Sequence, residues 1–207
     1  LRNLELNINS SFSAMFGPDL LENDPYNGKS LYVPMSGYAA ALCARTDRIQ
    51  DPWYSIAGLN RGMLSVLGVR KKFSDAERTN LFNAQINYPR QFSGIGIALW
   101  EQVTLLAKKS ALSWYNVRRL VNIVKKSVYI YLLYSLQEPN DDFLRKQIVD
   151  ALSQYLEIIK NRRGVLDYLI VSSLINNPPI IYNAGILKVS VFITPTIATH
   201  EIQVDMI

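Results

Sequence analysis

The segment that most constrains the fold is 115-YNVRRLVNIVKKSVYIYLLYSLQEPND-141. Its first half places Val117, Leu120 and Val124 on one side at helical spacing, with basic residues on the other side. Over 128–136 almost every residue is apolar, which leaves this half of the segment without a polar face. The run is about half as long as a membrane span, which needs roughly 18 apolar residues. The pattern therefore predicts one long helix whose second half is buried on all sides by protein.

A second long helix follows directly. Pro139 ends the first helix, and Asn140 can cap the next one, which is predicted to run to about Lys160 and to stop at Gly164. Its predicted apolar face consists of Leu144, Ile148, Leu152, Tyr155 and Ile159.

Strands are predicted both before and after this helical pair. Residues 30–34 form a short strand ahead of a helix, and Ser74 with Glu77 form a capping box ahead of a helix over 75–84. A period of two over 95–103 predicts another strand. The last forty residues carry strand patterns over 165–174, 187–194 and 198–206.

These elements predict a mixed α/β fold in which a β-sheet is packed by two long helices and the C-terminal strands are antiparallel. Residues 1–32 are rich in turn-forming residues, and we assign them to a separate N-terminal segment. Residues 33–207 form the predicted core domain.

The composition argues against several classes of enzyme. Cys43 is the single cysteine among 207 residues, so neither a disulfide framework nor a cysteine metal cluster can form. His200 is the single histidine, so any histidine-based zinc site or catalytic triad would have to use it. We expect His200 to be a half-exposed strand residue. The GxG within 93-SGIGIA-98 lacks the third glycine of a dinucleotide fingerprint. We therefore expect no catalytic activity and no cofactor or metal.

The basic residues favour acidic partners only modestly, because the net charge is +5. Basic pairs recur along the chain, but no pattern of a nucleic-acid-binding module accompanies them. Solvated faces or ion pairs with protein are the favoured interpretation, and nucleic-acid binding is a remote alternative. No segment is long and apolar enough to predict membrane insertion.

An ordered series of short motifs resembles one family. The motifs are 33-VPMSGYAAALCARTD-47, 52-PWYSIAGLNRG-62, 86-IN-87, 94-GIGIALWEQVTL-105, 116-NVRRL-120, 138-EPND-141 and 176-NN-177. In order and spacing they resemble the C-terminal part of the tail sheath proteins of contractile-tailed bacteriophages, which are kin to the sheaths of pyocins and secretion systems. One position departs from the family: Glu101 stands where a glycine usually follows the tryptophan.

This resemblance implies a structural role. Sheath subunits polymerise around a tail tube, and contraction drives the tube through the host envelope for genome ejection. The implied partners are further sheath subunits, the tail tube protein, and the baseplate and tail terminator proteins. The implied location is the virion tail, after assembly in the host cytoplasm. A sheath subunit of a related injection system, such as a pyocin or a type VI secretion system, is the alternative. Because the family's distal domains are missing, we expect the chain to be a fragment.

The resemblance also implies two kinds of contact residue. By its pattern alone, strand 198–206 is expected either to complete its own sheet or to pair with a neighbouring subunit, and the pattern favours the first. Terminal strands are shared between neighbouring sheath subunits, so the resemblance favours a link between subunits through Ala198, His200, Ile202, Val204 and Met206. Basic residues on the two long helices are candidates for ion pairs with the tube or with adjacent subunits. These are Arg118, Arg119, Lys125, Lys126, Lys160, Arg162 and Arg163.

Overall fold

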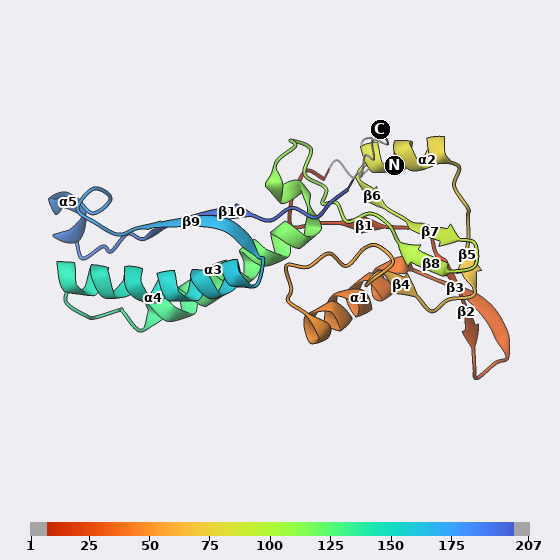
Figure 1. Ribbon diagram of the computed structural model, residues 1–207, viewed down its shortest axis with the longest axis horizontal. Helices are drawn as coiled ribbons and strands as arrows, with labels where there is room; N and C mark the ends of the chain where they lie inside the picture. Colours follow the sequence, from red (N-terminus) through yellow and green to blue (C-terminus); the bar gives the residue numbers. More distant parts are fainter. Residues whose placement is uncertain (1–7, 201–207) are drawn as a thin grey trace, which may run out of the picture. The chain divides into compact units, whose positions relative to one another are not determined.

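The computed structural model describes residues 8–200, and the chain divides into two compact units. Unit 1 comprises the residues up to Arg119 together with the segment from Ile197 onward, and unit 2 comprises Leu120–Thr196. Both units mix helices with small sheets, which confirms the predicted α/β fold class (Figure 1). The predicted boundary between the N-terminal segment 1–32 and the core domain 33–207 differs from the boundary between these two units, and it stays a prediction.

Unit 1 contains the following elements among its described residues: β1 (Met15–Phe16), β2 (Leu20–Asp24), β3 (Lys29–Val33), α1 (Met35–Ile49), β4 (Met63–Leu64), β5 (Gly68–Val69), α2 (Asp75–Asn83), β6 (Ile86–Asn87), β7 (Pro89–Phe92), β8 (Gly96–Leu99) and the 3-10 helix η2 (Ala111–Ser113). Two antiparallel sheets have the strand orders β3-β2-β5 and β4-β8-β7, and β1 pairs with β6 in parallel.

Several predicted elements of unit 1 are confirmed. The strand near 30–34 is β3, and the strand over 95–103 contains the shorter β8. Helix α2 begins with the capping box, in which the Ser74 side chain accepts from the Glu77 backbone and Glu77 accepts from the Ser74 backbone. Strand β2, in contrast, lies in the segment predicted to be loop-rich, and its pairing with β3 and β5 makes it a strand.

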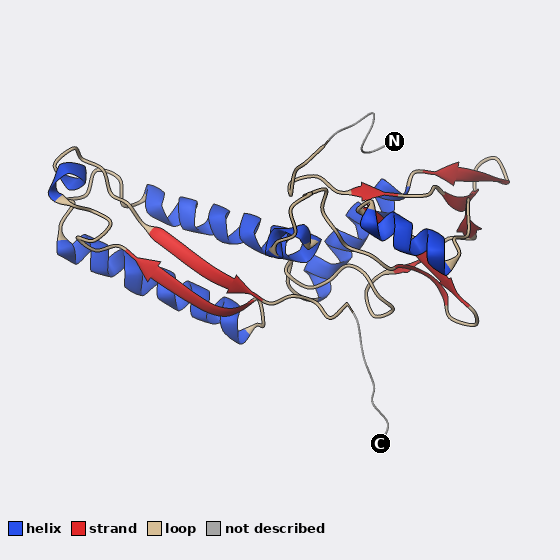
Figure 2. Ribbon diagram, turned by 90° about the horizontal axis from the view of Figure 1, so that it is seen from above, coloured by secondary structure: helices blue, strands red, loops and turns tan. Residues whose placement is uncertain are grey.

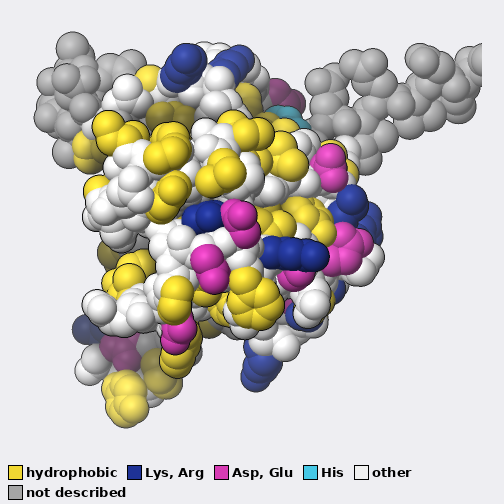
Figure 3. All heavy atoms as spheres, turned by 90° about the vertical axis from the view of Figure 1, so that its left-hand side faces the viewer, with side chains coloured by type: hydrophobic (Ala, Val, Ile, Leu, Met, Phe, Trp, Pro, Cys, Tyr) yellow, Lys and Arg dark blue, Asp and Glu magenta, His cyan; other side chains and the backbone are white. Residues whose placement is uncertain are grey.

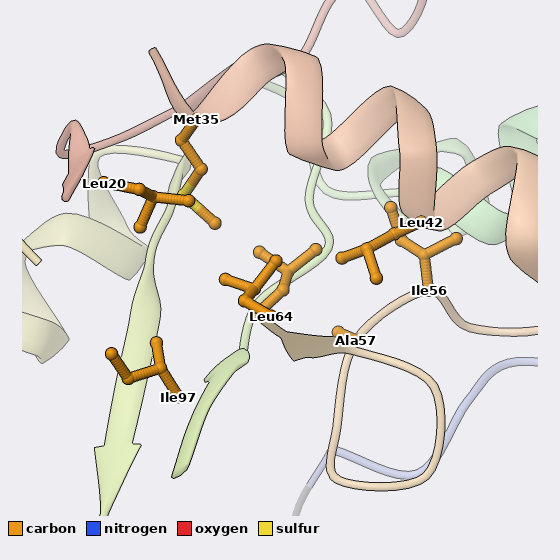
Figure 4. Close-up of a cluster of buried hydrophobic side chains, with 8 residues drawn as sticks. Leu20, Met35, Leu42, Ile56, Ala57, Leu64 and Ile97 are labelled. Carbon is orange, nitrogen blue, oxygen red and sulfur yellow. The ribbon is translucent and has the colours of Figure 1, made fainter. Parts of the chain in front are cut away.

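The core of unit 1 joins residues that are far apart in the sequence. Met35 and Leu42 of α1 point toward side chains of the strands and of the loop that carries Ile56 (Figure 4). The complete cluster is Leu20, Met35, Leu42, Ile56, Ala57, Leu64, Ile97 and Leu99. Burial of this set from two sheets, a helix and a loop holds unit 1 together.

Helix α3 (Tyr115–Leu133) begins in unit 1 and continues into unit 2. The other elements of unit 2 are α4 (Asp142–Asn161), β9 (Val165–Val171), α5 (Pro179–Tyr182) and β10 (Ser190–Pro195). Helices α3 and α4 run in opposite directions, and the antiparallel pair β9–β10 lies along them (Figures 1 and 2). The two long helices and the two strands were predicted from sequence and are confirmed. No helix in the described part of the chain is long and apolar enough to cross a membrane.

The start and the apolar face of α4 differ in detail from the prediction. Asp141 caps the helix, since its side chain accepts from the Leu144 backbone N–H at 2.8 Å. Asn140 instead donates to the Ile186 carbonyl at 3.0 Å. On the buried face, Leu156 is fully buried, whereas Tyr155 is only partly buried.

The predicted burial of the whole second half of the first long helix is wrong. Tyr129, Ile130 and Leu133 are 63%, 45% and 44% exposed. Val128 and Leu132 on the opposite side pack on the core of unit 2. Within the described residues this helix is covered from one direction only, by α4 and the β9–β10 pair, so its other side faces outward.

The connection between β9 and β10 is held by two asparagines. The Asn177 side chain is fully buried; its Nδ2 donates to the carbonyls of Ser173 and Lys188 at 3.2 and 2.9 Å, and its Oδ1 accepts from the Lys188 N–H at 2.6 Å. Asn176 adds a bond from its Nδ2 to the Val171 carbonyl at 2.7 Å. One side chain thus satisfies backbone groups on both sides of the connection.

We expect Asn177→Ala to lower the free energy of unfolding, because buried backbone groups would lose their partners. A buried group left unsatisfied costs roughly 1–3 kcal/mol. Urea denaturation measures the change. Asn183→Ala, at an exposed position of the same connection, is the matched control and should change stability by less than about 0.5 kcal/mol. Equal effects of the two substitutions would contradict the assigned role of Asn177.

Candidate subunit interface

The two faces of the β9–β10 pair differ in what covers them. Ile170 and Val191 lie opposite each other and pack on the core of unit 2. Leu169 and Phe192 also lie opposite each other, but they are 59% and 58% exposed. Neighbouring strand residues point to opposite faces, so the face away from the helices carries an exposed apolar pair. Exposed apolar surface of this kind is typical of an interaction site.

The edges of the same strand pair are also open. In residues 8–200, β9 and β10 form a two-stranded sheet in which neither strand pairs with a third strand. Each strand therefore presents a row of backbone N–H and C=O groups on its outer side. Such an edge is a template for the addition of a further strand.

Further apolar side chains are exposed on unit 2. Figure 3 views this unit from the end that carries α5, and hydrophobic side chains occupy a large share of the visible face. Exposed large apolar residues of unit 2 include Tyr134, Leu136, Phe143, Leu174, Ile175, Ile180 and Ile186. A single soluble subunit rarely exposes so many, which points to coverage by other protein.

The first two basic candidates are engaged within unit 1. Arg118 is buried, donates to Ser11 Oγ at 2.6 Å and lies over the Phe12 ring, 4.1 Å from its centroid. Arg119 forms an ion pair with Asp47. Arg118 was predicted to lie on the polar face of the helix, and it is buried because the first turn of α3 is packed into unit 1. Burial lowers the pKa of the Arg118 guanidinium.

The other basic candidates lie in unit 2. Lys125 and Lys126 are exposed on α3, and Arg162 and Arg163 are exposed just after α4. Lys160 forms an ion pair with Asp167 of β9, with Nζ and Oδ1 3.3 Å apart. The seven candidates thus do not form one group: two are used inside unit 1, one is paired along unit 2, and four are at the surface of unit 2.

The proposed linking strand begins in unit 1. Ala198 and His200 belong to unit 1, and the described residues 196–200 have no strand partner. Ile202, Val204 and Met206 lie outside the described residues. His200 is partly exposed, as predicted, but it is not in a strand. Its ring contacts Phe82 and Trp114, with centroids 4.9 and 5.3 Å away.

His200 meets the buried carboxylate of Glu101, a residue that was not predicted as a site residue from the sequence. Its Nε2 is 2.9 Å from Oε2 of Glu101, a residue only 4% exposed. The Tyr88 hydroxyl donates to Oε1 of the same carboxylate at 3.3 Å. Burial raises the pKa of the Glu101 carboxyl, while the hydrogen bonds from His200 and Tyr88 act in the opposite direction. The signal in the sequence is an acidic residue two positions after the apolar strand β8.

We expect Glu101→Gln to weaken the pH dependence of stability. Because the folded state raises the pKa of Glu101, the folded state holds this proton more tightly than the unfolded chain. The stabilisation that this tighter proton binding gives the folded state is fully present below the ordinary pKa of 4.5 and is lost as the pH rises through the raised pKa. As the pH rises above the ordinary value of 4.5, the wild type should therefore lose stability relative to the glutamine variant.

Urea denaturation at several pH values measures this difference. Glu138→Gln, at an exposed position, is the control and should follow the wild type. Parallel pH profiles for wild type and the Glu101 variant would show that this carboxyl has the same proton affinity in the folded and unfolded states.

Comparison with known proteins finds proteins that are similar to this chain. No family model matches the chain. It is 32% identical over 205 residues to the tail sheath protein of Vibrio phage KVP40, covering 98% of this chain and 30% of the relative. It is 31% identical over 202 residues to the tail sheath protein of Enterobacteria phage T4, covering 97% and 31%. The chain thus spans about a third of the length of these relatives.

Solved structures share the fold. The sheath of an extracellular contractile injection system, PVC, in its contracted state matches with a TM-score of 0.84 at 21% identity, covering 96% of this chain and 56% of that one. The contracted helical sheath of the anti-feeding prophage matches with a TM-score of 0.84 at 19% identity, covering the same shares.

The chain is therefore similar over nearly its whole length to about a third of the length of phage tail sheath proteins, as the motif series indicated. The glycines of the 52–62 motif and Asn87 of the 86–87 motif lie in unit 1, whereas 138–141 and Asn176–Asn177 lie in unit 2.

Proposed function

We propose that this chain is part of the structural subunit of a contractile phage tail sheath, which polymerises around a tail tube and contracts to drive the tube through the host envelope for genome ejection. The observation that carries the proposal is the identity of 32% and 31% to phage tail sheath proteins along almost the entire chain. The exposed apolar face and open edges of β9–β10 support a surface that is completed by other subunits.

A sheath subunit of a related injection system is the second candidate. The high structural similarity to the anti-feeding prophage and PVC sheaths favours it, but the sequence identity to them is only about 20%. The greater identity to phage proteins favours the phage tail. In either case the subunit acts by assembly and not by catalysis. Its partners are copies of itself, the tube, the baseplate and the tail terminator, in a virion tail assembled in the host cytoplasm.

We further propose that the C-terminal strand links subunits by adding to an open strand edge of a neighbour. Both edges of the β9–β10 pair could accept it. Of the basic candidates, Lys125, Lys126, Arg162 and Arg163 are those at the surface of unit 2 for ion pairs with the tube or with adjacent subunits. Exposed ion pairs contribute about 0–1 kcal/mol each, so many can break together during contraction.

Negative-stain electron microscopy of the full-length gene product, expressed alone, tests the proposal. We expect long hollow tubes of uniform width. Deletion of 198–207 should abolish them, because the linking strand is lost. A variant with Leu169→Ser and Phe192→Ser, at the exposed face of the strand pair, should also assemble poorly while remaining folded.

Dispersed monomers at all protein and salt concentrations would contradict the proposal. The similarity would then concern the fold alone, and DNA binding would be the next property to measure. Nucleic-acid binding would show itself as an affinity that falls steeply with salt.

A further inference from the structure

The contact between Glu101 and His200 joins residues 99 positions apart in the sequence. It is formed within unit 1, where the chain returns at Ile197 after passing through unit 2. A buried carboxylate is stable only when it is hydrogen-bonded, and here the imidazole and the Tyr88 hydroxyl are its partners. Hydrogen bonds to a charged group are also about twice as strong as neutral ones.

The residues just before His200 are also seated in unit 1. Ala198, Thr199 and His200 line a pocket of about 110 Å³ together with Ser55, Ala57 and Gly58. The ring of His200 lies near Phe82 of α2 on one side and near Trp114 on another. Three consecutive residues of the C-terminal segment therefore contact the same part of the unit.

The acceptor is held by rigid backbone. Glu101 follows β8 closely, and the backbone on both sides of it is bonded: the Trp100 N–H donates to the Tyr88 carbonyl at 3.0 Å, and the Gln102 carbonyl accepts from Tyr115 at 2.9 Å. A glycine at position 101 would leave His200 without the carboxylate. The anchor thus depends on the carboxylate of Glu101.

We propose that Glu101 and His200 form an anchor that fixes the chain up to His200 to its own subunit, so that this part of the chain is not exchanged with a neighbour. Ala198 and His200 then belong to the anchor and not to the linking strand. The anchor itself is a property of this chain. Only its meaning for assembly rests on the proposed sheath function.

The anchor is testable on this chain by carboxypeptidase digestion followed by mass spectrometry. We expect digestion of the wild type to slow sharply at His200. Glu101→Leu keeps a side chain of similar size at the buried site but removes the acceptor, and it should release His200 roughly 10- to 100-fold faster, the ratio expected for loss of one charge-assisted hydrogen bond. Glu101→Gln retains an acceptor oxygen but loses the charge, so its release of His200 should be faster than in the wild type and slower than in Glu101→Leu.

Thr199→Ala is the matched control, because it changes a neighbouring residue that lines the same pocket without touching the hydrogen bond. Its digestion should follow the wild type. Circular dichroism establishes that each variant is folded. Equal digestion of wild type and Glu101→Leu in their folded states would overturn the proposal.

Proton NMR supplies an independent measurement, since the single histidine gives uniquely assignable imidazole signals. Ring currents from Phe82 and Trp114 should displace these signals from the positions of free histidine in the wild type. In Glu101→Leu they should move toward the free positions. If the imidazole signals of the wild type already lay at the positions of free histidine, the anchor would be overturned, irrespective of whether the full-length protein forms tubes. Absence of tubes with an intact anchor would count against the sheath function alone.

Discussion

Gly62→Ala is expected to destabilise unit 1 by roughly 3 kcal/mol or more, at the upper end of what overpacking costs. A Cβ at this position would lie 2.8 Å from both the Gly58 and Leu99 carbonyl oxygens. Neither oxygen can move freely, because backbone hydrogen bonds connect Gly58, Gly62 and Leu99 with one another. Gly62 donates to Gly58 at 2.7 Å, Leu99 donates to Gly62 at 2.8 Å, and Gly58 donates to Leu99 at 2.9 Å. The added carbon must therefore break hydrogen bonds that hold the 58–62 loop against β8.

Gly37→Ala is the matched control for this substitution. Gly37 lies in α1, and a Cβ there would meet no atom within 4 Å. Alanine should stabilise the helix by up to about 1 kcal/mol. Urea denaturation of both variants measures the two effects. A Gly62 variant as stable as the Gly37 variant would show that the 58–62 loop can shift without cost.

Asn87→Leu is the second substitution with a large expected effect. The Asn87 side chain is fully buried; its Nδ2 donates to the carbonyls of Met15 and Val103 at 3.0 and 2.9 Å, and its Oδ1 accepts from the Val103 N–H at 2.6 Å. Leucine has a similar size but leaves these three backbone groups without their partner. At roughly 1–3 kcal/mol for each unsatisfied group, the loss should be at least about 3 kcal/mol.

Thermal and urea denaturation measure this loss. The control is Asn83→Ala at an exposed position at the end of α2, which should change stability by less than about 0.5 kcal/mol. If the Asn87→Leu variant kept full stability, water or a rearranged backbone would have to replace all three bonds. The hydrogen bonds also explain why an Ile-Asn pair belongs to the motif series: the asparagine ties β1 to the segment after β8.

Local patterns in the sequence were enough to predict most helices and strands. The spacing of apolar residues identified α3 and α4, and the Ser74–Glu77 pair identified the start of α2. The strand patterns near 165 and 187 correspond to β9 and β10. Such elements depend on residues within one or two turns of each other, so a single sequence contains the information.

The ordered motifs went further and identified the relationship to tail sheath proteins, although each motif alone is short. They did not reveal the role of individual residues. Asn87 and Gly62 stood in the motifs, but only the hydrogen bonds and the close approach of the backbone give the reason for those residue types.

The tertiary structure decided which faces are covered and which distant groups meet. Apolar residues of α3 prefer burial, yet Tyr129 and Ile130 face outward because α4 and the strand pair cover only one side. A basic residue prefers water, yet Arg118 is buried because the first turn of α3 packs in unit 1. His200 and Glu101 meet across 99 residues. Sequence patterns state what a side chain prefers, whereas burial and pairing depend on the other elements that the fold brings to it.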